Sequence, residues 1–111
     1  MKPLVTLLFV LVTVTSYNAE IGQTDSSPCT GASGRNLCVA AHEGDRTIAL
    51  SRDLLKTFRW HDKVRLVSDN PACNGLFSVE DALNKRFTKR ADLFFLTRSQ
   101  NTSCSASISR P

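Results

Sequence analysis

The sequence predicts a mostly-β fold, a small barrel or a sandwich, with one short helix. The chain has 111 residues, and beyond its first twenty it keeps about 90 residues, enough for one small domain. Many short apolar runs of strand length alternate with polar turns, and long helical periodicity is rare. The composition is that of a globular protein, with 41% hydrophobic and 22% charged residues, and is not typical of a disordered chain.

The N-terminus resembles an export signal. Lys2 precedes an apolar run over residues 4–14, which is the pattern of a signal peptide. The run is far shorter than the ~20 apolar residues of a membrane-spanning helix. Cleavage after Ser16 or after Ala19 fits this pattern. The alternating, β-branched stretch 12–17 also fits a buried first strand.

These two interpretations overlap in sequence. We therefore predict residues 1–19 as a signal peptide or N-terminal anchor that overlaps the first strand. Residues 20–111 form the folded domain. The protein is expected to be exported, to the periplasm or the cell envelope.

The chain has four cysteines: Cys29, Cys38, Cys73 and Cys104. An even number in a small exported domain predicts two disulfides, and three pairings are possible. We favour Cys29–Cys38, which closes a short loop rich in Gly and Ser, and this leaves Cys73–Cys104. A zinc site with His42 or His61 is the alternative, but no pair has the Cys-x-x-Cys spacing of structural zinc sites. We expect neither a metal nor a cofactor.

The first half of the domain begins with a loop. Residues 18–37 are rich in Ser, Thr, Gly and Asn, which predicts a long surface loop. Residues 38–41 and 47–50 are short apolar runs around a polar turn, so both are predicted strands. Residues 51–58 predict one or two helical turns, with Ser51 as the N-cap.

The second half contains the clearest strands. Residues 62–67 alternate charged and apolar side chains, which predicts a half-exposed strand. Residues 75–81 form the next strand, and 84–90 a polar, basic connection. Residues 91–96 are strongly apolar and are the best core candidate. The Ser-rich stretch 105–109 is a poor candidate for a final strand.

Two carboxylates stand out on these strands. Asp81 ends one apolar strand, and Asp92 lies inside the next. An aspartate in such a place is costly unless it is hydrogen-bonded, paired or exposed in a cleft. Desolvation favours its protonated form, which a general acid requires. Strand alternation places Asp92 on the face opposite to that of Leu93 and on the same face as Phe94. Alternatively, Asp92 only accepts backbone N–H groups and fixes a loop.

The segment around these carboxylates resembles a known family. Residues 79–87 (Val-Glu-Asp-Ala-Leu-Asn-Lys-Arg-Phe) and 91–95 (Ala-Asp-Leu-Phe-Phe) resemble the signature of the three-aspartate (Asp-Asp-Asp) domain. Its relatives include the barrel of membrane-bound lytic transglycosylase A and the stationary-phase survival proteins of spore formers. Weaker similarity covers a first strand, a loop and the middle strands: residues 13–18, 23–34, 48–55 and 62–66.

The resemblance implies a six-stranded double-psi β-barrel, with one or two short helices, that acts on peptidoglycan. Enzymes of this group cleave the bond between N-acetylmuramic acid and N-acetylglucosamine without water and leave a 1,6-anhydro end. By this resemblance Asp92 is the catalytic acid and Asp81 orients it. Candidate substrate-binding residues lie between the two: Asn84, Lys85, Arg86, Lys89 and Arg90.

One departure from the family pattern favours a second function. Ser51 stands where the family has its first aspartate, and Asp53 is shifted from that place by two residues. The alternative is a non-catalytic peptidoglycan-binding or envelope module on the same barrel. A small secreted effector is a third possibility, supported only by the Ser-rich tail that carries Cys104.

The charge pattern bears on partners. The net charge of +4 favours an anionic partner, such as a cell-wall polymer. No nucleic-acid-binding motif accompanies the short basic run, so nucleic acid is not expected as a partner. We expect a monomer that binds peptidoglycan glycan strands and does not span a membrane.

Overall fold

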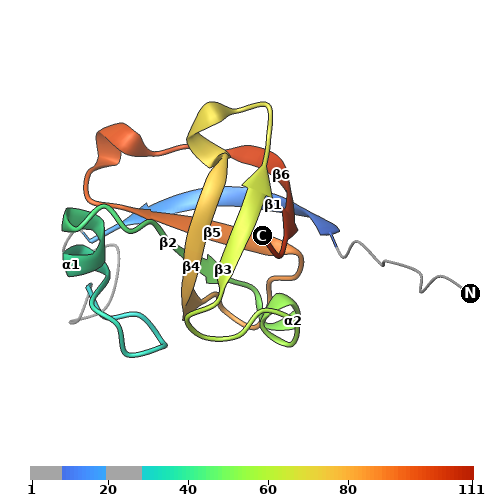
Figure 1. Cartoon of the computed structure of the whole chain (residues 1–111), viewed down its shortest axis with the longest axis horizontal. Coiled ribbons are helices and arrows are strands. Elements are labelled where there is room, and N and C mark those ends of the chain that lie inside the picture. Colours follow the sequence, from blue (N-terminus) through green and yellow to red (C-terminus); the bar gives the residue numbers. More distant parts are fainter. Residues whose placement is uncertain (1–8, 20–28) are drawn as a thin grey trace, which may run out of the picture.

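The computed structural model describes residues 9–19 and 29–111. Within them the chain forms a closed six-stranded β-barrel with two short α-helices (Figure 1). The strands are β1 (Phe9–Asn18), β2 (Thr47–Leu50), β3 (Lys63–Val67), β4 (Gly75–Ala82), β5 (Arg90–Phe95) and β6 (Cys104–Ser109). The helices are α1 (Leu37–His42) and α2 (Arg52–Leu55), and two 3-10 turns are η1 (Pro71–Cys73) and η2 (Arg98–Gln100). The predicted fold class is confirmed.

The strands follow the order β1-β5-β2-β4-β3-β6 around the barrel. The β1–β5 and β2–β4 pairs are parallel, and the other four pairs are antiparallel. The first and last strands are therefore neighbours, blue and red in Figure 1. The helices α1 and α2 lie at opposite ends of the barrel.

The core fills the interior of the barrel. Each strand sends two alternate side chains inward, as the two-residue period of a strand requires. These are Val12 and Val14, Ile48 and Leu50, Val64 and Leu66, Phe77 and Val79, Ala91 and Leu93, and Ala106 and Ile108. Leu54 of α2 and Phe58 just after it belong to the same cluster. The outward positions of the strands remain available for other roles.

The strand predicted over residues 38–41 is wrong, because this stretch lies in α1. The side chain of Asn36 accepts a hydrogen bond from the Val39 amide and caps the helix. Leu37 and Ala40, three positions apart, are its buried residues, as expected for one face of a helix. The apolar run that suggested a strand thus packs with helical spacing.

The prediction of a poor final strand is also wrong. β6 pairs with β1 over six residues and with β3 over three. Ala106 and Ile108 alternate with serines that face outward, so the inner face is apolar although the stretch is Ser-rich. Pairing on both sides makes β6 the strand that closes the barrel.

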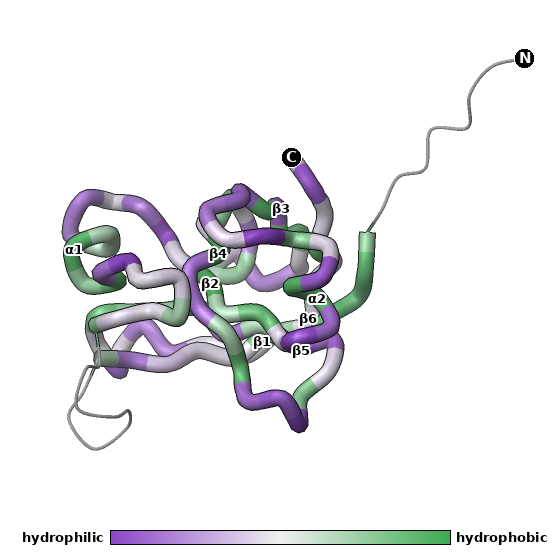
Figure 2. Tube along the Cα trace, turned by 90° about the horizontal axis from the view of Figure 1, so that it is seen from below, coloured by the Kyte–Doolittle hydropathy of each residue, from purple (hydrophilic) through white to green (hydrophobic). Residues whose placement is uncertain are grey.

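β1 confirms the strand interpretation of residues 12–17. It pairs along its length with β5 and β6 and contributes Val12 and Val14 to the core. Cleavage after Ser16 or Ala19 would remove most or all of this strand. The start of β1 is hydrophobic and exposed at Phe9 and Leu11 (green in Figure 2). Residues 1–8 of the predicted export segment lie outside the described residues.

Two disulfides join the cysteines in the favoured pairing, Cys29–Cys38 and Cys73–Cys104. The first closes the loop before α1, and the second ties η1 to β6. The rest of the predicted loop, residues 20–28, is outside the described residues. In the part of the chain that is described, no helix has the length and apolar character needed to cross a membrane.

Candidate functional site

A row of four side chains crosses the outer face of the barrel. In the strand register, Asp92 of β5 faces Thr15 of β1 on one side and Ala49 of β2 on the other. Ala49 in turn faces Asp81 of β4. The two aspartates thus flank one alanine, whose single methyl group leaves space between them.

A β-bulge explains why Asp81 belongs to this row. The β2–β4 register pairs Ile48 with Val79 but Ala49 with Asp81, so Glu80 is the inserted residue. A bulge of this kind re-aims the side chains that follow it. Asp81 therefore joins the outer row, and Glu80 is buried beneath a loop.

The aspartates share an open groove of about 280 Å³. Its lining residues are Tyr17, Ala49, Asp81, Ala82, Leu83, Asn84 and Asp92. Asp92 is partly exposed, while its neighbours Ala91 and Leu93 are buried in the core. A ligand can therefore reach both carboxyl groups from the same side.

Asp81 is held by three donors. The Tyr17 hydroxyl donates to Oδ2 at 2.9 Å, and the backbone amides of Ala32 and Ala82 donate to Oδ1, each at 2.9 Å. Burial raises the pKa of Tyr17 well above its usual value, and the Asp81 and Asp92 carboxylates raise it further. The phenol therefore stays protonated and keeps donating. Asp81 is fixed in the geometry of a fully hydrogen-bonded carboxylate.

Asp92 has a simpler environment. The Thr15 hydroxyl donates to its Oδ1, and the Arg90 guanidinium donates to the Thr15 oxygen at 3.4 Å. No described residue donates to Oδ2 of Asp92. The two carboxyl groups therefore differ: one is saturated with donors, and the other keeps an oxygen free toward the groove.

The loop from Thr30 to Asn36 packs against the end of β4, next to Asp81. The Ser33 amide donates to the Glu80 carbonyl at 3.1 Å, and Ala32 reaches Asp81. A Cβ atom on Gly31 would lie 2.3 Å from the Glu80 carbonyl oxygen. Only glycine allows the loop to approach β4 this closely.

The buried side chain of Glu80 holds the same loop in place. Its side chain is 1% exposed and binds Ser33 Oγ at 2.8 Å, Arg35 Nη1 at 3.0 Å and His61 Nδ1 at 2.7 Å. Arg35 also pairs with Asp45, which pairs with Lys63. We name this set the Glu80 network. It holds the loop that reaches Asp81, and none of its residues lines the groove.

The predicted substrate-binding residues separate into two groups. Asn84 lines the groove, and Arg90 reaches its edge through Thr15. The other three, Lys85, Arg86 and Lys89, are exposed on the connection between β4 and β5. They are not among the residues that line the groove.

The sequence interpretation missed Thr15 and Tyr17 as site residues. Both lie on the outer face of β1, two positions apart, and each hydrogen-bonds one of the aspartates. Because they alternate with the apolar Val12 and Val14, the sequence indicates that Thr15 and Tyr17 lie together on the outward face of the strand. Their partners could not be inferred without the β1–β5 pairing.

Ser51, the residue just before α2, is fully buried. Although it occupies the N-cap position of α2, its side chain makes no cap hydrogen bond. Its oxygen accepts a hydrogen bond from the Arg90 amide at 3.1 Å. Burial alone would raise the pKa of Asp53, but hydrogen bonds from Ser51 and the Lys89 amide hold it below its usual value. The described lining of the groove therefore carries two carboxylates, not three.

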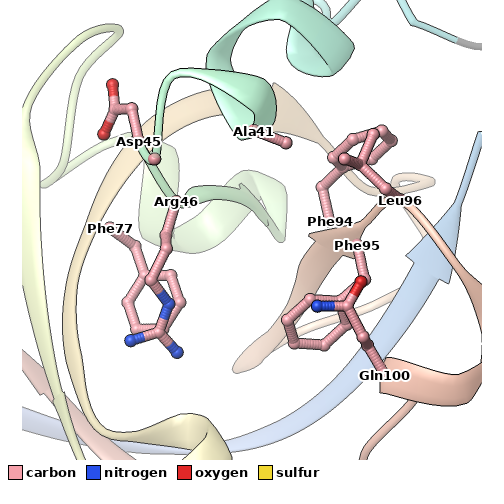
Figure 3. Close-up of a pocket in the computed structure, with 9 residues that line it drawn as sticks. Ala41, Asp45, Arg46, Phe77, Phe94, Phe95, Leu96 and Gln100 are labelled. Atoms are coloured by element: carbon pink, nitrogen blue, oxygen red, sulfur yellow. The ribbon is translucent and has the colours of Figure 1, made fainter.

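A separate cavity of about 210 Å³ lies at one end of the barrel (Figure 3). Phe77, Phe94 and Phe95 give it an apolar wall. Arg46 stacks over the Phe77 ring at 4.1 Å, donates to two backbone carbonyls and has its pKa lowered by burial. Among the residues that line this cavity, Asp45 is the only carboxylate, and it belongs to the Glu80 network. The cavity therefore offers no pair of acids.

Within the described residues, no three His, Cys, Asp or Glu side chains gather as a metal site. No family model, curated protein or solved structure matches the chain. The functional assignment therefore depends on the groove itself.

Proposed function

We propose that this protein is a lytic transglycosylase-like enzyme that cleaves the bond between N-acetylmuramic acid and N-acetylglucosamine in peptidoglycan. Asp92 is the general acid. The observation that carries the proposal is the pair of aspartates on either side of Ala49, in one open groove with unequal hydrogen bonding. Asp81 accepts three hydrogen bonds, whereas one oxygen of Asp92 has no donor among the described residues, which suits Asp92 to the role of proton donor.

The reaction balances with these groups alone. Protonated Asp92 gives its proton to the glycosidic oxygen, and the bond from that oxygen to the anomeric carbon of muramic acid breaks. The 6-hydroxyl of the same sugar forms a bond to that carbon, and its proton passes to the Asp92 carboxylate. Asp81, kept as an acceptor by its three donors, stabilises the positive charge on the sugar ring.

This route differs from glycoside hydrolysis. A hydrolase must activate a water or use a second carboxylate as a nucleophile. Internal capture by the 6-hydroxyl needs neither. A single free carboxyl oxygen beside a fixed carboxylate is sufficient.

The rest of the molecule is compatible with a substrate outside the cytoplasm. Two disulfides are typical of proteins in oxidising compartments. The positive net charge of +4 favours association with an anionic wall polymer.

Digestion of purified cell wall tests the proposal. The wild-type chain is expected to release 1,6-anhydro-muropeptides, and Asp92→Asn to lose about 100-fold or more of that rate. Asp81→Asn should lower the rate while the groove stays intact. Asp69→Asn, at an exposed carboxylate on the β3–β4 connection, is the matched control. Absence of anhydro products from the wild type, or equal rates for Asp92→Asn, would exclude the enzyme.

A second candidate is a non-catalytic peptidoglycan-binding module on the same barrel. The buried Ser51 at the place of the first aspartate favours it. If this second candidate is right, the chain sediments with insoluble peptidoglycan and releases no anhydro product. The Asp92→Asn variant then binds peptidoglycan as well as the wild type does.

A further inference from the structure

The connection between β4 and β5 carries two stacked arginines. The guanidinium of Arg86 lies 4.7 Å from the centroid of the Phe87 ring, and that of Arg90 lies 4.5 Å from the same centroid. Contacts of this kind hold a guanidinium in place without using its N–H donors. Both side chains are therefore ordered and keep donors for another partner.

No ion pair among the described residues neutralises the positive charges of Arg86 and Arg90. The ion pairs of the described residues involve Arg35, His61 and Lys63, and none involves Arg86 or Arg90. Lys85 and Lys89 add two exposed ammonium groups to the same connection. Several cations on one short connection raise the local positive potential, so an anion bound beside them is stabilising.

The arginines lie at the rim of the candidate active site. Arg90 donates to the Thr15 oxygen at 3.4 Å, and Thr15 donates to Asp92. Asn84, from the same connection, lines the groove. An anionic group bound by the arginines would therefore belong to the ligand whose glycosidic bond reaches Asp92.

We infer that Arg86 and Arg90, stacked on Phe87, form a subsite for a carboxylate carried by the glycan. The inference deepens the proposed function, from which it takes the class of glycan. A guanidinium matches a carboxylate with two parallel hydrogen bonds. The lactyl or peptide carboxylates on muramic acid supply that group, and a neutral N-acetylglucosamine polymer does not. The subsite thus selects the acidic glycan before any bond is cleaved.

Binding to two matched glycans tests the subsite. The full chain carrying Asp92→Asn, which prevents turnover, is titrated by calorimetry with a muramyl tetrasaccharide whose carboxylates are free or blocked as methylamides. The acidic glycan should bind about tenfold more tightly than the blocked one. Arg86→Gln should remove most of this preference without changing the affinity for the blocked glycan.

Two further variants sharpen the test. Arg90→Lys keeps the charge but not the planar fork, so the preference should fall although the net charge is unchanged. Arg65→Gln removes an exposed cation from β3, away from the groove, and should leave the preference intact. Equal affinity for both glycans, binding of neither, or a preference that Arg86→Gln leaves unchanged would each overturn the subsite.

The two proposals fail in different ways. A carboxylate preference without anhydro products from the wild type would exclude cleavage and leave the subsite standing. Anhydro products released at equal rates from both glycans would exclude the subsite and leave the enzyme standing.

Discussion

Tyr17 contacts both Asp81 in the groove and the ring of Phe94. Its hydroxyl donates to Asp81, and its ring packs edge-to-face on Phe94 with centroids 5.4 Å apart. Because burial and the neighbouring carboxylates raise its pKa, the phenol stays protonated and remains a donor at neutral pH. Tyr17 is thus a positioning residue that acts through Asp81.

Tyr17→Phe isolates this role. The substitution keeps the ring and its contact with Phe94 but removes one of the three donors to Asp81. We expect kcat for anhydro product release to fall about tenfold with little change in KM, and the free energy of unfolding to fall by about 1 kcal/mol. Steady-state kinetics and urea denaturation measure the two effects. An unchanged kcat would show that the hydroxyl has no part in positioning Asp81.

Gly31 and Gly34 form a matched pair in the same loop. Gly31→Ala places a methyl group against the Glu80 carbonyl, so the loop must move away and the Ala32 amide leaves Asp81. We expect a loss of about 1–3 kcal/mol in unfolding free energy together with lower activity. Gly34 has a φ of +93° and open space around its Cβ position, so Gly34→Ala should cost about 1 kcal/mol with activity retained. Equal effects on activity would contradict the role of the Gly31 contact.

At the scale of elements, the ion pairs of Asp45 within the Glu80 network connect three segments. Arg35 comes from the loop before α1, Asp45 from the turn before β2, and Lys63 from the start of β3. Burial alone would raise the pKa of Asp45, but Lys63 and Arg35 outweigh it and hold the pKa below its usual value. The two ion pairs of Asp45 therefore stabilise the fold only while Asp45 is ionised.

The Asp45 carboxylate should make stability sensitive to acid. Because its pKa is lower in the folded state, its contribution is present above the unfolded-state pKa of about 3.9. That contribution is lost as the pH falls through the folded-state pKa. Asp45→Asn should therefore be less stable than the wild type at pH 7, and the difference should shrink toward pH 2. Urea denaturation across this range measures it, with Asp69→Asn as the control. A difference that does not change with pH would contradict the ion pairs.

The elements differ in how well their residues reveal them. β3, β4 and β5 were predicted nearly to their ends, since alternation and apolar runs decide a strand locally. α1 was mistaken for a strand because four apolar residues suit either structure, and the cap at Asn36 was overlooked. β6 was underrated because its serines have weak strand propensity, whereas its pairing with β1 and β3 determines its structure.

The two aspartates of the candidate site could be predicted from the sequence, but the residues that hold them in place could not. Asp81 and Asp92 drew attention because a carboxyl group on an apolar strand requires a reason. Thr15, Tyr17 and Ala49 are ordinary strand residues until the strand order is known. The β-bulge at Glu80, which sets the direction of Asp81, left no signal in local propensity.

At the scale of the whole molecule, the two disulfides act on different parts. Cys73–Cys104 spans 31 residues and ties the β3–β4 connection to β6, whereas Cys29–Cys38 spans 9 residues and closes the loop whose Ala32 amide reaches Asp81. Loop-closure entropy makes the longer crosslink the more stabilising.

Paired Cys→Ser variants separate these effects. Removing Cys73–Cys104 should cost about 3.5 kcal/mol of unfolding free energy, and removing Cys29–Cys38 about 2.5 kcal/mol. Only the second should also reduce activity under conditions where both variants are folded. Urea denaturation and product release provide the comparison. Unimpaired activity without Cys29–Cys38 would show that the loop keeps its place through Glu80 alone.

The position of β1 between β5 and β6 has a consequence for biosynthesis. Thr15 and Asp92, which share a hydrogen bond, are 77 residues apart in the chain. Such distant pairings form late, after the intervening chain has been made. The groove therefore forms only after β5 has been made and has paired with β1.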